Sequence, residues 1–473
     1  ISDFTQMTIK ENLEFLNKLE DPTAKYIIDP LKKQLEALEY IGLSYLTLNR
    51  VTTTLSGGEA QRLKLIRHLN SSLSDLVYII DEPSVGLHPE DIAKINEILK
   101  SLKDKGNTVL IVEHDPDVIK EGDYIIDIGP GSGKNGGEIT FEGTYNELLS
   151  SNTSTGNALR HKHNLKENIR EANHFYNIGP VTQNNLNNVK TSIPKHVLTV
   201  LTGVAGSGKS TLVKAGFENN DHTIFIDQKA VQGSNRSNLL TYLGVFDSVR
   251  SFFSKETGLN KAMFSYNSKG ACPNCGGKGY IKTELAFMGD FSQTCEVCHG
   301  KRYKQEVLDA TIDGYSIADV LNLTVDEGII FFDKKNDIKS KLQSVSKTGL
   351  NYMSLGQPLS TLSGGEIQRV KLGQHLDEEI KNSIFIFDEP TTGLHESDIP
   401  ILMECFDDLI DQNNTVILIE HNLSIMCEAD WIIDVGPGPG LDGGKVQFSG
   451  TPKNFIDSSE TLTSKHLKRY INQ

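Results

Sequence analysis

Short apolar runs alternate along this chain with longer amphipathic stretches. Residues 76–81 (LVYIID) and 383–388 (SIFIFD) are apolar and rich in β-branched or aromatic side chains, and so are residues 108–114 (TVLIVEH) and 415–421 (TVILIEH). Runs of this length predict buried parallel strands. Between them, residues 90–106 form a helical pattern that closes at a glycine, with one apolar stripe made of Ile92, Ile95, Ile98, Leu99 and Leu102. The alternation predicts a doubly wound α/β fold.

The pattern occurs twice. An offset of 307 positions lays Ser56 on Ser363 and Asp81 on Asp388, without a net insertion. At this offset GLSYLTL covers GLNYMSL, and IIDEPSVGLH covers IFDEPTTGLH. Such a long match in one register indicates duplication of a domain.

The duplication predicts three parts. Residues 1–150 are expected to be the C-terminal part of a first copy, the polar residues 151–178 a linker, and residues 179–473 a second copy. The second copy carries an expected insertion at about 240–350. Since the chain opens inside the first copy, the counterpart of the second copy's N-terminal part is expected before Ile1, in a longer protein of which this chain is a fragment. The alternative is a first copy that is naturally truncated.

One phosphate-binding loop is predicted, GVAGSGKS at 203–210. An apolar strand pattern precedes this loop and a helical pattern follows it. Glycines let backbone N–H groups surround phosphates, a lysine reaches the terminal phosphates, and a hydroxyl ligates magnesium. The candidate nucleotide-binding residues are Gly203, Gly206, Ser207, Gly208, Lys209, Ser210 and Thr211. A similar segment, GPGSGKNGG at 129–137, lacks Ser or Thr after Lys134 and is interpreted as a surface turn.

Paired acids end one predicted strand in each copy, and a histidine ends the next. The carboxyl ends of parallel strands form the nucleotide crevice of open α/β sheets. Asp388 is expected to hold magnesium through water, Glu389 to orient or deprotonate the attacking water, and His421 to touch the γ-phosphate. Gln228, at the end of TIFIDQ, is a weaker candidate. The first copy supplies the corresponding candidates Asp81, Glu82 and His114.

Four cysteines have the spacing of a metal site. Cys272, Cys275, Cys295 and Cys298 form C-x2-C-x19-C-x2-C, which predicts a closed tetrahedral four-thiolate zinc site that fixes a hairpin. Residues 261–305 around them carry seven basic and three acidic side chains, although the whole chain has a net charge of −15. A local basic excess suits contact with a DNA backbone. The candidate DNA contacts are Lys261, Lys269, Lys282, Lys301, Arg302 and Lys304.

Length and composition indicate the number of domains and the cellular compartment. A chain of 473 residues exceeds one ordinary core, so at least two domains are expected. No run of 18 apolar residues occurs, and the opening residues lack the pattern of a signal peptide. Six cysteines in so long a chain, four of them in C-x2-C pairs, fit a reducing compartment. These features predict a cytoplasmic protein.

The phosphate loop, the two D-E-P strand ends and the two L-S-G-G-E-x-Q-R segments together resemble the ABC-type ATPases. More specifically, the doubled G-L-H, the cysteine pairs and FSGTP at 448–452 resemble the UvrA family, the DNA-damage-sensing ATPases of bacterial nucleotide excision repair. The resemblance implies a duplicated P-loop NTPase of ABC type with a zinc-stabilised insertion in the second copy. It also implies ATP, Mg2+ and Zn2+ as cofactors.

In that family each nucleotide lies between the phosphate loop of one domain and the L-S-G-G-E-x-Q-R segment of the other, which is called the signature. The resemblance therefore implies that Ser56, Gly57 and Gly58 face the nucleotide held by Lys209. Ser363, Gly364 and Gly365 would face a loop outside this chain. It further implies a homodimer that binds damaged or distorted double-stranded DNA, with no nuclease activity of its own, and a partner, UvrB, contacted through a segment outside this chain.

Two alternatives stay open at this point. One is a UvrA-like paralogue that confers resistance to DNA-binding antibiotics. The other is the ATPase subunit of a membrane transporter, which shares every ATPase motif but does not call for the cysteine pairs or the long insertion.

Overall fold

The computed structural model describes residues 1–19, 23–55, 57–69, 73–161, 164–229, 237–285, 289–378 and 380–472. The chain divides into two compact units. Unit 1 comprises residues 1–130, 136–227 and 380–473, and unit 2 comprises residues 131–135 and 228–379. Unit 1 therefore contains most of the first copy together with the phosphate loop and the C-terminal part of the second copy.

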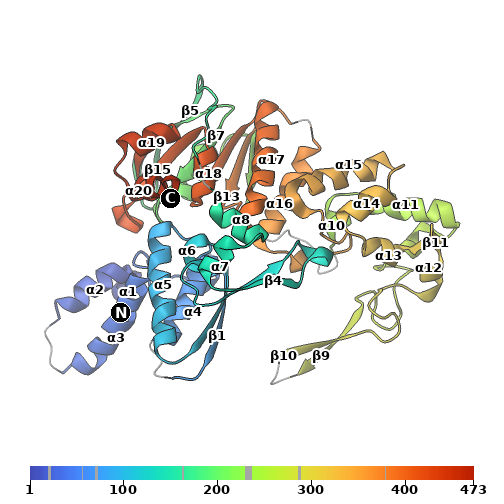
Figure 1. Cartoon of the computed structure of the whole chain (residues 1–473), viewed down its shortest axis with the longest axis horizontal. Coiled ribbons are helices and arrows are strands. Elements are labelled where there is room, and N and C mark those ends of the chain that lie inside the picture. The colour runs from blue at the N-terminus through green and yellow to red at the C-terminus, as the bar shows by residue number, and fades with distance from the viewer. Residues whose placement is uncertain are drawn as a thin grey trace. The chain divides into compact units, whose positions relative to one another are not determined.

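A six-stranded sheet forms the centre of the second copy in unit 1 (Figure 1). Its order is β16-β15-β7-β14-β13-β8, and every neighbouring pair is parallel except β15 and β16. The strands are β7 (Leu198–Thr202), β8 (Thr223–Ile226), β13 (Ile384–Asp388), β14 (Thr415–Ile419), β15 (Trp431–Gly436) and β16 (Lys445–Gly450). Strands β7 and β14 are buried at every position, as their continuous apolar sequence predicts.

The connections and flanks of this sheet are mostly helical. A hairpin of β5 (Phe175–Gln183) and β6 (Leu186–Pro194) precedes β7. The helices are α9 (Lys209–Phe217), α17 (Ile399–Asp411), α18 (Leu423–Glu428), α19 (Pro452–Ser458) and α20 (Leu462–Ile471). Helix α17 buries Leu402, Phe406 and Leu409 along one face, which is the spacing of an amphipathic helix. The doubly wound α/β fold is thus confirmed in the second copy.

The first copy repeats part of this architecture in the same register. Strand β1 (Val77–Asp81) pairs in parallel with β2 (Thr108–Val112), and β3 (Ile125–Gly129) pairs antiparallel with β4 (Glu138–Gly143). The offset of 307 lays the start of β1 on that of β13 and the start of β2 on that of β14. The helices are α1 (Ser2–Gln6), α2 (Ile9–Asn17), α3 (Lys25–Tyr40), α4 (Gly57–Leu69), α5 (Pro89–Asp104), α6 (Pro116–Ile119), α7 (Tyr145–Ser150) and α8 (Ser154–Arg160).

The expectation that residues 76–81 and 108–114 are buried on both faces is wrong. Ile79 is 75% exposed, whereas its counterpart Ile386 is 2% exposed. In the second copy, β7 lies between β14 and β15, and β8 flanks β13. Helix α9 covers one face of that sheet, where Leu212, Val213 and Phe217 share a cluster with Ile386. The described residues of the first copy contain no counterpart of this helix, so that face of β1 and β2 stays open to solvent while Ile80 packs into the core.

The segment expected as a linker is anchored to the second copy. Helix α8 contributes Thr155, whose hydroxyl lies 3.1 Å from His395 Nε2. Farther along, the backbone N–H of Lys166 donates to Cys427 O at 2.9 Å. Arg170 forms ion pairs with three acids of unit 1, Asp407 at 2.8 Å, Asp411 at 3.2 Å and the buried Asp430 at 3.4 Å.

Unit 2 has its own core, formed largely by helices. Its elements are α10 (Leu239–Tyr242), α11 (Phe246–Thr257), β9 (Tyr280–Leu285), β10 (Gly289–Thr294), α12 (Gln305–Asp309), β11 (Thr311–Ile312), β12 (Tyr315–Ser316), α13 (Ile317–Leu321), α14 (Val325–Phe331), α15 (Asn336–Val345) and α16 (Gly364–Leu376). Phe253, Phe264 and Phe332 are completely buried among these helices. Strands β9 and β10 form an antiparallel hairpin that projects from the helices of this unit (Figure 1).

Candidate functional site

The phosphate loop connects β7 to α9, as the sequence predicts. Gly203 has φ 129°, and a Cβ placed there would lie 2.0 Å from the carbonyl oxygen of Val435. Gly208 caps α9 with φ 103°. No other residue type fits these two positions without strain, since left-handed backbone is accessible to glycine at little cost. The N-terminus of α9 therefore opens on a loop whose shape depends on glycine.

Lys209 points back into this loop. Its Nζ donates to the carbonyl oxygens of Gly203 at 2.8 Å and Val204 at 2.9 Å. Burial lowers the pKa of Lys209 to about 8, while the carboxylates of Glu389 and Asp434 oppose that shift. Nearby, the buried Ser207 Oγ has no hydrogen-bond partner in the part of the chain that the structure describes. A concentration of donors on a helix N-terminus suits a phosphate.

Asp388 ends β13 beside this loop. Ser210 Oγ lies 3.5 Å from Asp388 Oδ1, so the hydroxyl and carboxylate predicted to serve magnesium lie next to each other. Glu389 follows in left-handed backbone with φ 52°. Burial raises the pKa of Glu389 to about 7, and the charges of Asp388 and Glu420 add to the shift.

His421 completes this group. Its Nε2 lies 4.0 Å from Glu389 Oε1. Glu420, which sequence analysis did not single out, accepts hydrogen bonds from the backbone N–H groups of Thr391 at 3.0 Å, His421 at 2.8 Å and Asn422 at 3.1 Å. Burial holds the pKa of His421 well below its usual value, so the imidazole stays neutral at physiological pH.

The first copy repeats this arrangement with greater exposure. Glu82 also has left-handed backbone, with φ 45°, and its Oε1 lies 3.8 Å from His114 Nδ1. Burial raises the pKa of Glu82 as well. Both copies therefore place the strand-end glutamate within 4.0 Å of the histidine that ends the next strand.

Each copy places a glycine against the strand-end glutamate of the other. A Cβ on Gly86 of the first copy would lie 2.9 Å from Glu389 Oε2 of the second. Reciprocally, a Cβ on Gly393 would lie 3.6 Å from Glu82 Oε1. A pocket in unit 1 is lined from both copies, by Gly86 and His114 on one side and by Glu389 and His421 on the other. Sequence reasoning missed this contact, although both glycines belong to the doubled G-L-H.

The predicted signature residues are only partly described. Ser56 lies outside the described residues, and Gly57 and Gly58 begin α4. In the second copy, Ser363 caps α16, its hydroxyl accepting from Glu366 N at 3.2 Å, and Gly364 and Gly365 form the first turn. Gln228 lies beside Gly364, since a Cβ on that glycine would be 3.3 Å from Gln228 Cβ.

A tyrosine next to the first signature also contacts the phosphate loop. Tyr45 donates its hydroxyl hydrogen bond to Glu59 Oε1 at 2.6 Å. A Cβ on Gly206 would lie 3.0 Å from Cε1 of the Tyr45 ring. The first copy's α4 and the second copy's phosphate loop thus share one neighbour. Only the recurrence of tyrosine at 45 and 352 under the repeat offset could have signalled this residue.

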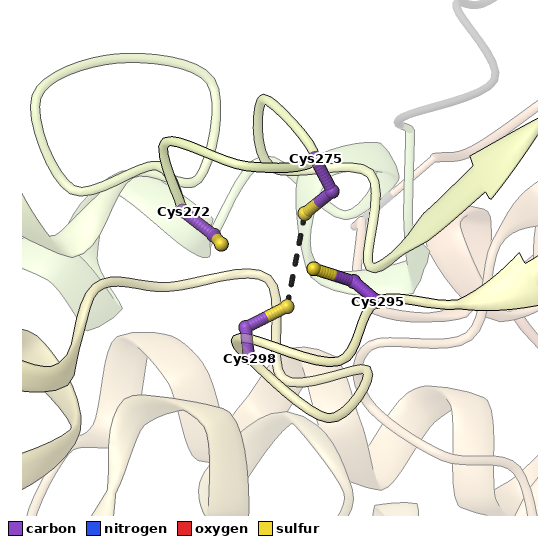
Figure 2. Close-up of side chains that lie close together, drawn as sticks. All are labelled: Cys272, Cys275, Cys295 and Cys298. Atoms are coloured by element: carbon purple, nitrogen blue, oxygen red, sulfur yellow. Dashed lines mark hydrogen bonds between the residues drawn. The ribbon is translucent and has the colours of Figure 1, made fainter.

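The four cysteine side chains converge at the base of the β9–β10 hairpin (Figure 2). All four are buried, and their Sγ atoms lie within 4.8 Å of one another. Two neighbours donate to sulfur: the backbone N–H of Gly279 to Cys275 at 3.2 Å and the side chain of Asn274 to Cys295 at 3.3 Å. Four sulfurs at this spacing, with N–H donors that favour thiolate, fit a tetrahedral zinc ion.

The candidate DNA contacts differ in how they are engaged. Lys261 pairs with Asp247 at 2.5 Å and Lys301 with Asp319 at 3.4 Å. The Arg302 guanidinium lies over the Tyr266 ring, 5.4 Å from its centroid. Lys304 is half-buried at the N-cap of α12, whereas Lys269 and Lys282 have exposed side chains. Three of the six candidates, Lys269, Lys282 and Lys301, therefore have exposed side chains.

A mostly parallel sheet whose phosphate loop, strand-end acids and histidine meet at one edge, in a chain that carries the sequence S-G-G-E twice, defines an ABC-type ATPase domain. Residues 186–392 match the family described as ABC transporter. No helix in the described parts of the chain is both long and apolar enough to cross a membrane.

The chain is 43% identical over its whole length to UvrABC system protein A of Clostridium perfringens and 41% identical to that of Bacillus subtilis. It covers 54% and 53% of those proteins, so it spans about half the length of the curated relatives it matches. The crystal structure of UvrA2 from Deinococcus radiodurans superposes with a TM-score of 0.93 at 37% identity, covering the whole chain and 63% of that structure. Over its whole length the chain is therefore similar to UvrA proteins.

Proposed function

We propose that this protein is an ATPase that binds double-stranded DNA and recognises damaged or distorted duplex in nucleotide excision repair. The observation that carries the proposal is the extent of the likeness. The alignment with UvrABC system protein A runs over the whole chain, across both copies and the segment that contains the cysteine pairs, at 43% identity. The relatives therefore share more with this chain than the ATPase motifs common to transporters, and the transporter alternative is not retained.

In the proposed nucleotide site, Lys209 and the N-terminus of α9 hold the phosphates. Ser210 and Asp388 hold Mg2+, which neutralises charge developing on the phosphoryl oxygens. Glu389, with its pKa raised to about 7, accepts the proton of the attacking water. His421 is held in place by the Glu420 carboxylate, which accepts from its backbone N–H, and its side chain donates to the γ-phosphate. Thr211 and Gln228 belong to the same proposed site.

The signature of the first copy completes this site in the proposal. Ser56, Gly57 and Gly58 approach the nucleotide from the other side, and the helix dipole of α4 adds positive potential there. The support is the position of Tyr45, which contacts both α4's Glu59 and the loop glycine Gly206. Ser363, Gly364 and Gly365 serve the corresponding site of the longer protein.

Zn2+ is proposed as a structural ion held by the four cysteines. Because sulfur would take all four coordination positions, the ion would link the two cysteine pairs and would leave no open position for a substrate or water. DNA contact is proposed through exposed lysines of this module, among them Lys269 before the cysteine cluster and Lys282 on β9. Contacts to the DNA backbone carry no sequence information, so we propose that the protein recognises the shape and deformability of the duplex.

One experiment tests the core of the proposal. In the full-length protein, fluorescence anisotropy at low salt is expected to show tighter binding to duplex carrying a bulky lesion than to intact duplex. Glu389→Gln is expected to abolish ATP turnover at its own site, and so to lower the total turnover, while ATP binding remains. No DNA affinity, or unchanged turnover in Glu389→Gln, contradicts it.

A second candidate is a UvrA-like paralogue that protects against DNA-binding antibiotics, favoured by the whole-chain likeness to UvrA2. Co-purification of the full-length homodimer with UvrB separates the two, since repair by excision needs that partner and the paralogue does not.

A further inference from the structure

Two glycine turns of equivalent position each contact the other copy of the duplicated domain. The first, at residues 129–137, was interpreted from sequence as a surface turn, and that interpretation is incomplete. A Cβ on Gly133 of this turn would lie 3.1 Å from Cβ of Tyr352 in the second copy. The second turn, at residues 436–444, repeats the contact, because a Cβ on Gly440 would lie 2.9 Å from Cβ of Tyr45 in the first copy.

The two contacts are related by the repeat. The offset of 307 carries Gly133 to Gly440 and Tyr45 to Tyr352. Both glycines have left-handed backbone, with φ 61° and 57°. Both tyrosines donate to the glutamate of their own signature, at 2.6 Å for Tyr45 and 2.8 Å for Tyr352. The tyrosine-on-glycine packing is therefore common to both contacts and cannot distinguish one copy from the other.

The charges beside this packing are reversed. In the first copy, Lys10 of α2 donates to Asp442 of the second turn at 2.6 Å. In the second copy, Glu327 of α14 accepts from Lys134 of the first turn at 2.7 Å. Helix α2 thus offers a cation to an acidic turn, while α14 offers an anion to a basic turn. On the turns, the offset of 307 carries Lys134 to position 441, one residue before Asp442. On the helices, Lys10 is the second residue of α2 and Glu327 the third residue of α14.

We propose that these turns are docking elements through which each copy recognises the unlike copy. The tyrosine contact provides the shared fit, and the reversed ion pairs decide which copies meet. If the second copies of two chains paired with each other, Asp442 of one would face α14 of the other, where Asp326 stands next to Glu327. The like charges oppose that pairing, whereas first with second is attractive at both turns.

The first test measures docking by hydrogen exchange in the full-length protein. The N–H groups of Gly440 and Gly444 are protected by the phosphate-loop carbonyls of Gly206 at 3.0 Å and Ser207 at 2.9 Å. Lys10→Glu is expected to speed their exchange about two- to fivefold at low salt, the range for one exposed ion pair. Combining it with Asp442→Lys is expected to restore slow exchange. Equal exchange in the wild type and Lys10→Glu, or no restoration in the double variant, overturns the docking role.

A matched control is the ion pair of Lys103 and Asp123, at 3.1 Å and similarly exposed but contained in the first copy. Its swap, Lys103→Glu with Asp123→Lys, is expected to leave exchange at the turn unchanged. Tyr45→Phe keeps the ring and is expected to keep docking, whereas Tyr45→Ala loses it. If Tyr45→Phe and Tyr45→Ala changed docking equally, the claim that the tyrosine ring packs on the turn glycine would be contradicted.

The second test measures selection. Lys10→Glu with Asp442→Lys keeps an attractive pair within the chain, but the new lysine also suits Glu327 of another chain. Sedimentation equilibrium is expected to show about two- to fivefold tighter self-association than the wild type at low salt, with the difference lost at high salt. Self-association equal to that of the Lys103 and Asp123 swap overturns the claim that charge selects the unlike copy. Neither test requires ATP turnover, so failure here is separate from failure of the proposed function.

Discussion

Replacing Gly86 of the first copy by alanine is expected to slow the ATP hydrolysis that depends on Glu389 of the second copy. The substituted residue lies in the first copy, and its Cβ would stand 2.9 Å from Glu389 Oε2 in the second. Real Cβ atoms do not approach an oxygen so closely, so the carboxylate has to move by a few tenths of an ångström. Because proton transfer depends on the position of the base, a shift of this size is expected to lower turnover at the Glu389 site about tenfold, which lowers the total kcat of the two sites.

The backbone adds a second cost. Gly86 has φ 67°, and left-handed backbone costs an alanine about 1 kcal/mol. Gly106 is the matched control, since its φ is 85° and a Cβ there would meet only Ser74 Cβ at 3.8 Å. Gly106→Ala carries the same backbone cost without touching a carboxylate.

The assay compares steady-state ATP turnover and urea unfolding of the two variants in the full-length protein. Similar losses of stability are expected in both, with kcat reduced only in Gly86→Ala and ATP affinity retained. If Gly86→Ala turns over ATP as fast as Gly106→Ala, the reasoning from the Glu389 contact is refuted. The prediction rests on the proposed ATP hydrolysis.

Three further outcomes are expected. Because the pKa of Glu389 is raised to about 7, its basic form accumulates above that value, so turnover should rise between about pH 6 and 8; a flat profile excludes Glu389 as the base. Cys275→Ser should lower bound zinc, measured by elemental analysis, while Cys405→Ser outside the cluster should not. Arg170→Ala leaves the buried Asp430 with fewer partners and should lower the free energy of unfolding by about 2 kcal/mol. Arg160→Ala, whose side chain is exposed, should change it little, and equal effects of the two would contradict the anchoring role.

Local features of this chain could be predicted from sequence because local forces set them. The apolar runs at 383–388 and 415–421 form β13 and β14, and the strand-end acids stand where the sheet ends. The four cysteines meet as their spacing requires. In each case the decisive information lies within a few residues or in a periodic pattern.

What sequence could not supply depends on which distant segments meet. The apolar run at residues 77–81 predicts a strand but does not say whether a helix covers its face, and Ile79 is exposed although Ile386 is not. Tyr45 and Gly86 have ordinary surroundings in the sequence and become site neighbours only when two copies meet. The exact 307-residue repeat pointed to such pairs without showing which surfaces they join.

The anchored connection between the copies has a kinetic consequence. From Lys166 onward the segment is fixed to the second copy, and Thr155 of α8 already contacts His395 there. A short tether holds its two ends at a high effective concentration, so separation of the copies is followed by rapid, unimolecular return. Opening and closing of the paired copies would then proceed at rates independent of how much protein the cell contains.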